Sequence, residues 1–188
     1  MIGHPRREPQ AGMVLVTSLL LLIVVTVLAV GMFRSFGLDE KIAGNMREKH
    51  RALTAAEAAE QYAEWWLANG NGTNGVPCTG PVALSALTVC SNLMTTPTQL
   101  PWAVGTTYLP NAPTAMPIST GGGPDTYVYA PAFYISYLGP WPLGNVSGIL
   151  YQIDAVGYAG SYDTAAVVES TYVIKFQSTC KSCSPGPG

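Results

Sequence analysis

Charged residues are scarce in this sequence. Asp, Glu, Lys and Arg make up 11% of its 188 residues, and the formal net charge is −2. Between Glu64 and Asp154 the only charged residue is Asp125. A chain with so little positive charge has no bulk attraction for a polyanion, so we expect no nucleic acid among its partners. The neutral stretch is rich in Pro, Gly, Thr and aromatic residues. Because disordered segments usually combine high charge with low hydropathy, this composition favours a compact region.

Cysteine is also limited, to four residues, all of which follow the apolar N-terminal run. Cys180 and Cys183 have CxxC spacing, which fits a redox pair, half of a zinc site or a disulfide. A redox pair normally starts a helix, and this one lies in a Pro/Gly-rich tail. A zinc site needs a second close pair, whereas Cys78 and Cys90 are twelve residues apart. We therefore expect structural disulfides and neither a metal nor a cofactor. Cys78–Cys90 with Cys180–Cys183 is favoured, and a crosswise pairing that ties the tail to the loop stays open.

The sequence has no obvious catalytic set. No pair of its later acidic residues has a spacing that implies acid–base chemistry, and Asp125, which follows three glycines, is read as part of a turn. His50 is read as a solvated helix position. We expect no catalytic residue, and we expect the tryptophans to fill the core of a small domain, since large aromatic side chains usually do so. They are Trp65, Trp66, Trp102 and Trp141.

A single long apolar run stands out against this background. Residues 13–33 hold 21 positions without a charge, about 31 Å as a helix, against a bilayer hydrocarbon core of about 30 Å. Arg6 and Arg7 precede the run, so the short N-terminus is expected to stay in the cytoplasm while the rest is exported. Taken alone, the run fits a plain single-pass anchor, or a signal peptide cut near Ala29 to Gly31. It is long for a signal peptide, whose apolar core is roughly 7–15 residues.

A second helical segment is expected at 34–69, continuous with the first because no proline lies between Gln10 and Val76. Apolar residues recur there at three-, four- and seven-residue steps, which predicts one face against a partner. The lower half is rich in alanine, which permits close packing, and the segment "NGNGTNG" is expected to end the helix. The residues of the predicted face are Leu38, Ile42, Met46, Leu53, Ala56, Ala59, Ala63 and Trp66.

The rest of the sequence, after the helical segment, predicts a loop region followed by a β-sheet. Residues 70–125 are expected to be a variable loop region, with a short helix at 81–88. Three runs at 126–139, 148–160 and 164–176 are rich in Tyr, Val and Ile with period-two stretches, and short links between them predict antiparallel strands within a domain at 126–188 that ends in the cysteine-containing tail. The alanine-rich half of the helix is the natural cover for one face of this sheet. We therefore predict an α+β fold.

Three segments resemble PilX-like minor pilins of type IV pili. They are "QAGMVLVTSLLLLIVVTVLAV", "LDEKIAGNMREKHRALTAAEAAEQYAE" and "YQIDAVGYAGSYDTAAVVESTYVIKF". The resemblance implies a type IV pilin fold and a class III leader peptide at 1–12, which prepilin peptidase would cut after Gly12 before methylating Met13. It further implies that the 13–33 helix leaves the inner membrane to become the filament core. The implied partners are the membrane, other minor and major pilins, prepilin peptidase and the inner-membrane assembly platform.

The chain departs from that family pattern at Thr17, the fifth position after the implied cut. Ordinary pilins carry Glu there, which pairs with the N-terminal amine of a neighbouring subunit. A hydroxyl does not neutralise that charge in an apolar core, where an unpaired charge is costly. Thr17 therefore favours a place at the pilus tip, in an initiating and capping complex. A K-like pseudopilin of type II secretion is one alternative, and a tip adhesin that binds through residues 76–124 is another.

Overall fold

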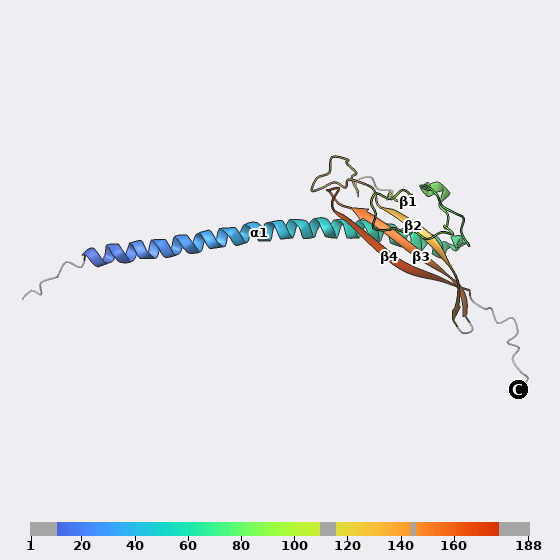
Figure 1. The fold of residues 1–188 in the computed structure, drawn as a ribbon, viewed down its shortest axis with the longest axis horizontal. Coiled ribbons are helices and arrows are strands. Elements are labelled where there is room, and N and C mark those ends of the chain that lie inside the picture. The colour runs from blue at the N-terminus through green and yellow to red at the C-terminus, as the bar shows by residue number, and fades with distance from the viewer. Residues whose placement is uncertain (1–10, 110–115, 144–145, 177–188) are drawn as a thin grey trace, which may run out of the picture. The chain divides into compact units, whose positions relative to one another are not determined.

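The computed structural model describes residues 11–109, 116–143 and 146–176. The chain divides after Met46 into two compact units, each described by itself below. A single helix, α1 (Ala11–Trp66), supplies the described part of the first unit and the start of the second (Figure 1). Its 56 residues run without interruption, as the absence of proline predicts.

Glycine and asparagine end the helix, as the sequence predicts. After Trp66 the chain makes one π-helical turn, η1 (Leu67–Asn71). Gly70 in that turn has a φ of +85°, a left-handed conformation that glycine adopts without steric cost. The side-chain amide of Asn69 donates a hydrogen bond of 2.7 Å to the carbonyl oxygen of Trp65, near the end of the helix. The α-helix ends at Trp66 and the π-helical turn follows it to Asn71, so the predicted end at residue 69 lies within that turn.

The second unit contains one antiparallel sheet in the order β1, β2, β3, β4 (Figure 1). Three of its strands are long and are joined by short links, and these strands are neighbours in the sheet, as the short links predict. The strands are β1 (Thr106–Thr107), β2 (Ala132–Leu143), β3 (Val146–Tyr158) and β4 (Ala165–Phe176). Together with α1 they form the predicted α+β, pilin-like arrangement of one long N-terminal helix and a C-terminal antiparallel sheet.

Two predicted strand limits are wrong. The sequence predicts a strand from Thr126, but the main chain of Tyr127 is bonded to residues 117 and 119, so β2 begins six residues later. The predicted link at 140–147 is largely strand instead, with Pro140 opposite Ile149 and pairing that continues to the end of β2. Among the described residues β1 pairs only with the start of β2, so the far end of β2 has a free edge, where proline is tolerated.

The region predicted as loop also contains regular structure. Thr106 and Thr107 pair with Phe133 and Ala132 as β1, a strand too short to give a periodic signal. The predicted helix at 81–88 is a single 3-10 turn, η2 (Leu84–Ala86). Of these two elements, β1 pairs with β2 and extends the sheet beyond the three predicted strands.

Alanines form the packing face of the helix in the second unit. Ala52, Ala55, Ala56, Ala59 and Ala63 are buried, with at most 2% of each exposed. The lower part of this stripe joins one core cluster with alternate residues of β2 and β3, which point to the helix side of the sheet. Those strand residues are Phe133, Ile135, Tyr151, Ile153 and Ala155.

Gly157 on β3 lies directly against the main chain of the helix. A Cβ atom at this position would overlap the main chain of Ala52 and Ala56. Only a residue without a side chain therefore permits this approach, and only small residues on the helix permit it from the other side. The small residues on both sides, the alanines of the helix and Gly157 of β3, together permit the close packing of helix on sheet.

The rest of the predicted apolar helix face is not buried. Leu38, Ile42 and Met46 are exposed in the first unit, and Leu53 is 39% exposed in the second. In the second unit the narrow stripe of alanines is in close contact with the sheet, and these larger apolar residues of the helix lie outside that stripe. The four tryptophans differ in burial. Trp65 is 58% exposed and Trp141 is also exposed, whereas Trp66 and Trp102 pack against core clusters. The prediction that all four tryptophans fill the core is therefore wrong.

Candidate functional site

The first candidate surface is the apolar part of α1. Every large apolar side chain from Met13 to Phe33 is about half exposed or more in the single chain, and the segment carries no charge. The helix is long and apolar enough to cross a membrane. An exposed surface of this kind needs lipid or other helices around it.

Thr17 lies on this surface with its hydroxyl turned back to its own helix. Its Oγ1 is 3.1 Å from the carbonyl oxygen of Met13 and 3.0 Å from that of Val14, and donates to these acceptors. Ser18 and Thr26 bond their own helix in the same way. Each hydroxyl in the apolar run therefore has a local acceptor for its proton, which suits both a bilayer and a packed helical core.

A cluster around Arg51, here called the arginine clasp, ties α1 to two distant loops within the second unit. The Arg51 guanidinium donates to Glu48 Oε1 at 2.8 Å and to the carbonyl oxygens of Pro124 and Thr126 at 2.7 Å each. Its Cζ also lies 4.6 Å from the centre of the Tyr127 ring. Planar guanidinium groups bind several acceptors at once and stack on aromatic faces, and this one does both.

Glu48 completes the clasp on the side of the β3–β4 turn. Its Oε2 accepts a hydrogen bond of 2.8 Å from the main-chain N–H of Gly160. Partial burial opposes ionisation, but the Gly160 hydrogen bond and the Arg51 cation outweigh it, so the pKa of Glu48 lies below its ordinary value. Arg47 adds an exposed pair with Asp125 at 3.2 Å, which contributes little because both side chains are largely in water.

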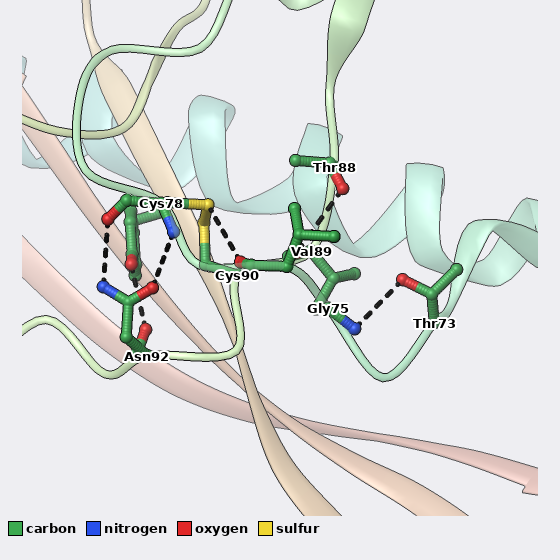
Figure 2. Close-up of a disulfide and its surroundings, with 9 residues drawn as sticks. Thr73, Gly75, Cys78, Thr88, Val89, Cys90 and Asn92 are labelled. Atoms are coloured by element: carbon green, nitrogen blue, oxygen red, sulfur yellow. Dashed lines mark hydrogen bonds between the residues drawn. A yellow bond between two sulfur atoms is a disulfide. The ribbon is translucent and has the colours of Figure 1, made fainter.

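The second candidate surface begins at a disulfide. Cys78 and Cys90 are bonded, with their Cα atoms 5.4 Å apart (Figure 2). Cys90 also pairs with β2: its N–H donates to Ile135, and its carbonyl accepts from Tyr137, at 2.8 Å each. The disulfide therefore joins the segment that follows the helix to the edge of the sheet. Cys180 and Cys183, the other predicted pair, lie outside the described residues.

Asn92 extends this anchor. Its side-chain amide brackets Cys78, accepting from the Cys78 N–H at 2.7 Å and donating to the Cys78 carbonyl at 3.0 Å (Figure 2). Its own carbonyl oxygen accepts from the Tyr134 hydroxyl at 2.9 Å. Three segments, at 78, 92 and 134, are thus held together without any charge.

Beside Asn92 lies a cleft of about 630 Å³, here called the 92–104 cleft. The loop at 92–104 forms its walls, and Tyr134 of β2 lines it. Tyr134 alternates with Phe133 and Ile135, which pack on the helix, so the cleft opens on the opposite face of the sheet. The Trp102 indole N–H donates to the carbonyl of Pro97 at 2.7 Å, which fixes the orientation of that ring.

One buried carboxyl group lies on the same face of the sheet. Asp154 on β3 is fully buried, opposite Tyr134 on β2 and Glu169 on β4. Gln152 Nε2 donates to the Asp154 carboxyl group, at 3.2 Å to each oxygen. Burial raises the pKa of Asp154 to about 6, and Glu169 adds to the increase against the effect of Gln152. Within the described ranges no group of three metal-ligating side chains occurs.

Residues 11–59 match the family model described as PilX N-terminal. This match, which covers less than half of the chain, makes its N-terminal part similar to PilX-like proteins of type IV pili. No curated protein matches it, and no solved structure does. The matched range holds the apolar helix with Thr17, the helical half of the clasp and the first four buried alanines. The disulfide, the 92–104 cleft and the sheet lie outside it.

The sequence alone predicted only part of these surfaces. Met13, Thr17, Cys78 and Cys90 are described, and the two cysteines are brought together. Gly12 lies within α1, at its start. The clasp and the cleft were missed. The sequence shows Glu48 and Arg51 as an i,i+3 pair, but their partners in the loops are main-chain groups, which leave no signal in the sequence.

Proposed function

We propose that this PilX-like protein is a minor pilin that helps to initiate and cap a type IV pilus as part of a tip complex. In this proposal prepilin peptidase removes residues 1–12, the new N-terminus on Met13 is methylated, and the apolar helix passes from the inner membrane into the filament. Before assembly the domain after the helix is periplasmic, and afterwards it is displayed outside the cell at the tip.

The observation that carries the proposal is Thr17 on an exposed, uncharged helix. The hydroxyl proton is already used by the carbonyl groups of Met13 and Val14. Only the oxygen lone pairs are left to meet a neighbouring subunit's amine, and a neutral acceptor does not cancel a cation in an apolar core. A subunit at the tip avoids this cost because no subunit beyond it brings an amine to its position 17.

The exposed residues farther along the helix agree with this role. Leu38, Ile42 and Met46 are spaced by four and remain exposed in the single chain. In a tip complex they extend the apolar contact surface of 13–33 toward neighbouring pilins, and the other minor pilins and the major pilin are the proposed partners.

The decisive measurement for processing is the mass of the N-terminal peptide of the protein purified from cells. We expect a peptide that begins at a methylated Met13. An intact leader would contradict processing as a pilin and support a plain membrane anchor. A cut near Gly31 would also contradict it and would support a conventional signal peptide.

The tip assignment has a separate test in the variant Thr17→Glu, with Ser18→Glu as the matched control. A carboxylate at 17 supplies the missing counter-charge, so this variant should become several-fold more abundant in sheared pili, whereas a carboxylate at 18 should not. If Thr17→Glu leaves its abundance unchanged, or if the original protein is found along the whole shaft, the tip role is wrong.

A further inference from the structure

The 92–104 cleft has no part in the proposed assembly. It lies on the face of the sheet opposite the helix and outside the residues matched by the family model. Its volume of about 630 Å³ is within the range of about 300–1,000 Å³ typical of sites for small molecules. A filament that packs through the helix leaves this face open.

The cleft is held in shape before any ligand arrives. Asn92 is bonded to Cys78 and Tyr134, and the Cys78–Cys90 disulfide fixes the neighbouring segment to the sheet. Trp102 is held by Pro97, and the N–H of Gln99 donates to the carbonyl of Thr96 at 3.1 Å. A preformed site loses less entropy on binding, so modest contacts suffice for measurable affinity.

The lining of the cleft disfavours charged ligands. Tyr134 is the only ionisable side chain in it, and burial together with the nearby Asp154 carboxyl raises the pKa of this tyrosine, which therefore stays neutral. No cation is present to bind a phosphate, sulfate or carboxylate. The walls instead combine apolar surface from Leu93, Leu100 and Trp102 with the hydroxyl and amide groups of neutral side chains.

Those neutral polar groups are available. The side chains of Thr95, Thr96 and Gln99 are exposed at the rim, and the described residues provide no hydrogen-bond partner for any of them. Apolar and aromatic surface beside uncharged donors and acceptors matches a sugar, which presents C–H faces and hydroxyl groups together. An extended peptide would need free main-chain edges, and next to the cleft the edge of β2 is already paired with β1 and Cys90.

We propose that the 92–104 cleft binds a neutral oligosaccharide, with Trp102 and Leu100 contacting the apolar faces of the rings and Thr95, Thr96 and Gln99 bonding their hydroxyl groups. The site would let a displayed subunit attach to an uncharged glycan surface. This inference does not require tip placement, because the cleft belongs to the second unit alone.

The test uses the full chain in nonionic detergent, applied to an array of neutral di- and trisaccharides of glucose, galactose and mannose together with their sialylated and sulfated counterparts. Hits are then measured by calorimetry. We expect at least one neutral sugar to bind, and its acidic counterpart to bind more weakly. The variants Gln99→Ala and Thr95→Val should each weaken binding about five- to tenfold, the value of one or two hydrogen bonds.

Matched controls separate the cleft from the rest of the surface. Gln61→Ala on the helix and Thr171→Val on β4 remove the same groups from exposed positions away from the cleft and should leave the affinity unchanged. Circular dichroism of all four variants checks the fold. The proposal is overturned if no neutral sugar binds, if the cleft variants bind as well as the controls, or if a neutral peptide library binds in the cleft and sugars do not.

Discussion

The carboxylate of Glu48 accepts a hydrogen bond from the main-chain N–H of Gly160, 112 residues later in the chain, at 2.8 Å. This bond and the contacts of Arg51 connect the part of α1 that matches the PilX N-terminal family model to loops outside the matched range. The clasp therefore holds the helix to the rest of the second unit through polar contacts, as the alanines do through apolar packing. Its contribution to stability can be measured on the full chain in nonionic detergent.

Glu48→Gln should destabilise the second unit by about 1 kcal/mol at pH 7, because the pair is only partly shielded from water. The pKa of Glu48 is lowered in the folded state, so its ionisation favours folding above the unfolded value of 4.5, and that contribution disappears as the pH falls through the lowered pKa. Urea unfolding should show the deficit at pH 7 and almost none at pH 3. Glu57→Gln, an exposed position on the same helix, is the control, and equal effects of the two variants would contradict the clasp.

In contrast to Glu48→Gln, the substitution Asp154→Asn should stabilise the protein at pH 7. Because the folded pKa is raised from 3.8 to about 6, the unfolded chain ionises first, and stability is lost as the pH rises between these values. The neutral amide avoids this cost, so we expect a gain on the order of 2 kcal/mol at pH 7 that vanishes below about pH 4. Urea unfolding of both proteins across pH 3 to 8 measures it. Asp163→Asn, an exposed aspartate, should change little. A destabilised Asp154→Asn protein at pH 7 would show that the carboxylate has a compensating partner.

Gly157→Ala should be severely destabilising. The added Cβ overlaps main-chain atoms of Ala52 and Ala56, and a helix backbone does not move aside as a flexible side chain does. A loss of about 3 kcal/mol or more is expected, at the upper end of overpacking effects. Gly80→Ala is the matched control, since no atom lies within 4 Å of a Cβ there. Thermal unfolding of both variants decides the matter, and similar midpoints would contradict the close approach.

Replacing both Cys78 and Cys90 by Ser should cost about 3 kcal/mol, the value for a closed loop of a dozen or so residues. The same loss should follow reduction of the unchanged protein. Replacing Cys180 and Cys183 together should leave the Cys78–Cys90 bond intact, as peptide mass mapping after proteolysis would show. A linked peptide that joins Cys78 or Cys90 to the tail would support the crosswise pairing instead.

The long helix and the sheet were predictable because their signals are local. An uncharged run, an absence of proline and a terminal cluster of glycine and asparagine determine α1, and alternating Tyr, Val and Ile determine most of β3 and β4. The limits of β2 were less predictable. Pro140 and Pro142 argue locally against a strand, and only the pairing with β3 overrides them.

The surfaces depended on contacts that no local pattern encodes. Leu53 was expected to face the sheet, but the approach of Gly157 to Ala52 and Ala56 favours the smaller residues. The clasp joins the charged side chains of Glu48 and Arg51 to main-chain groups of distant loops, and the cleft is lined by neutral side chains. In both, the partners are determined by where the chain folds back. Apart from the i,i+3 spacing of Glu48 and Arg51, neither surface has a recognisable sequence pattern.

By itself, the sequence determined that one uninterrupted helix begins with a surface fit for lipid or for other helices, and that Thr17 there carries no charge. Both follow from residue chemistry along one element, independent of what surrounds it. The tertiary structure alone decided which helix face is buried, that Arg51 meets the loop at 124–126, and that the neutral segment encloses a cleft. These depend on distances between residues far apart in the chain, which packing against the sheet establishes.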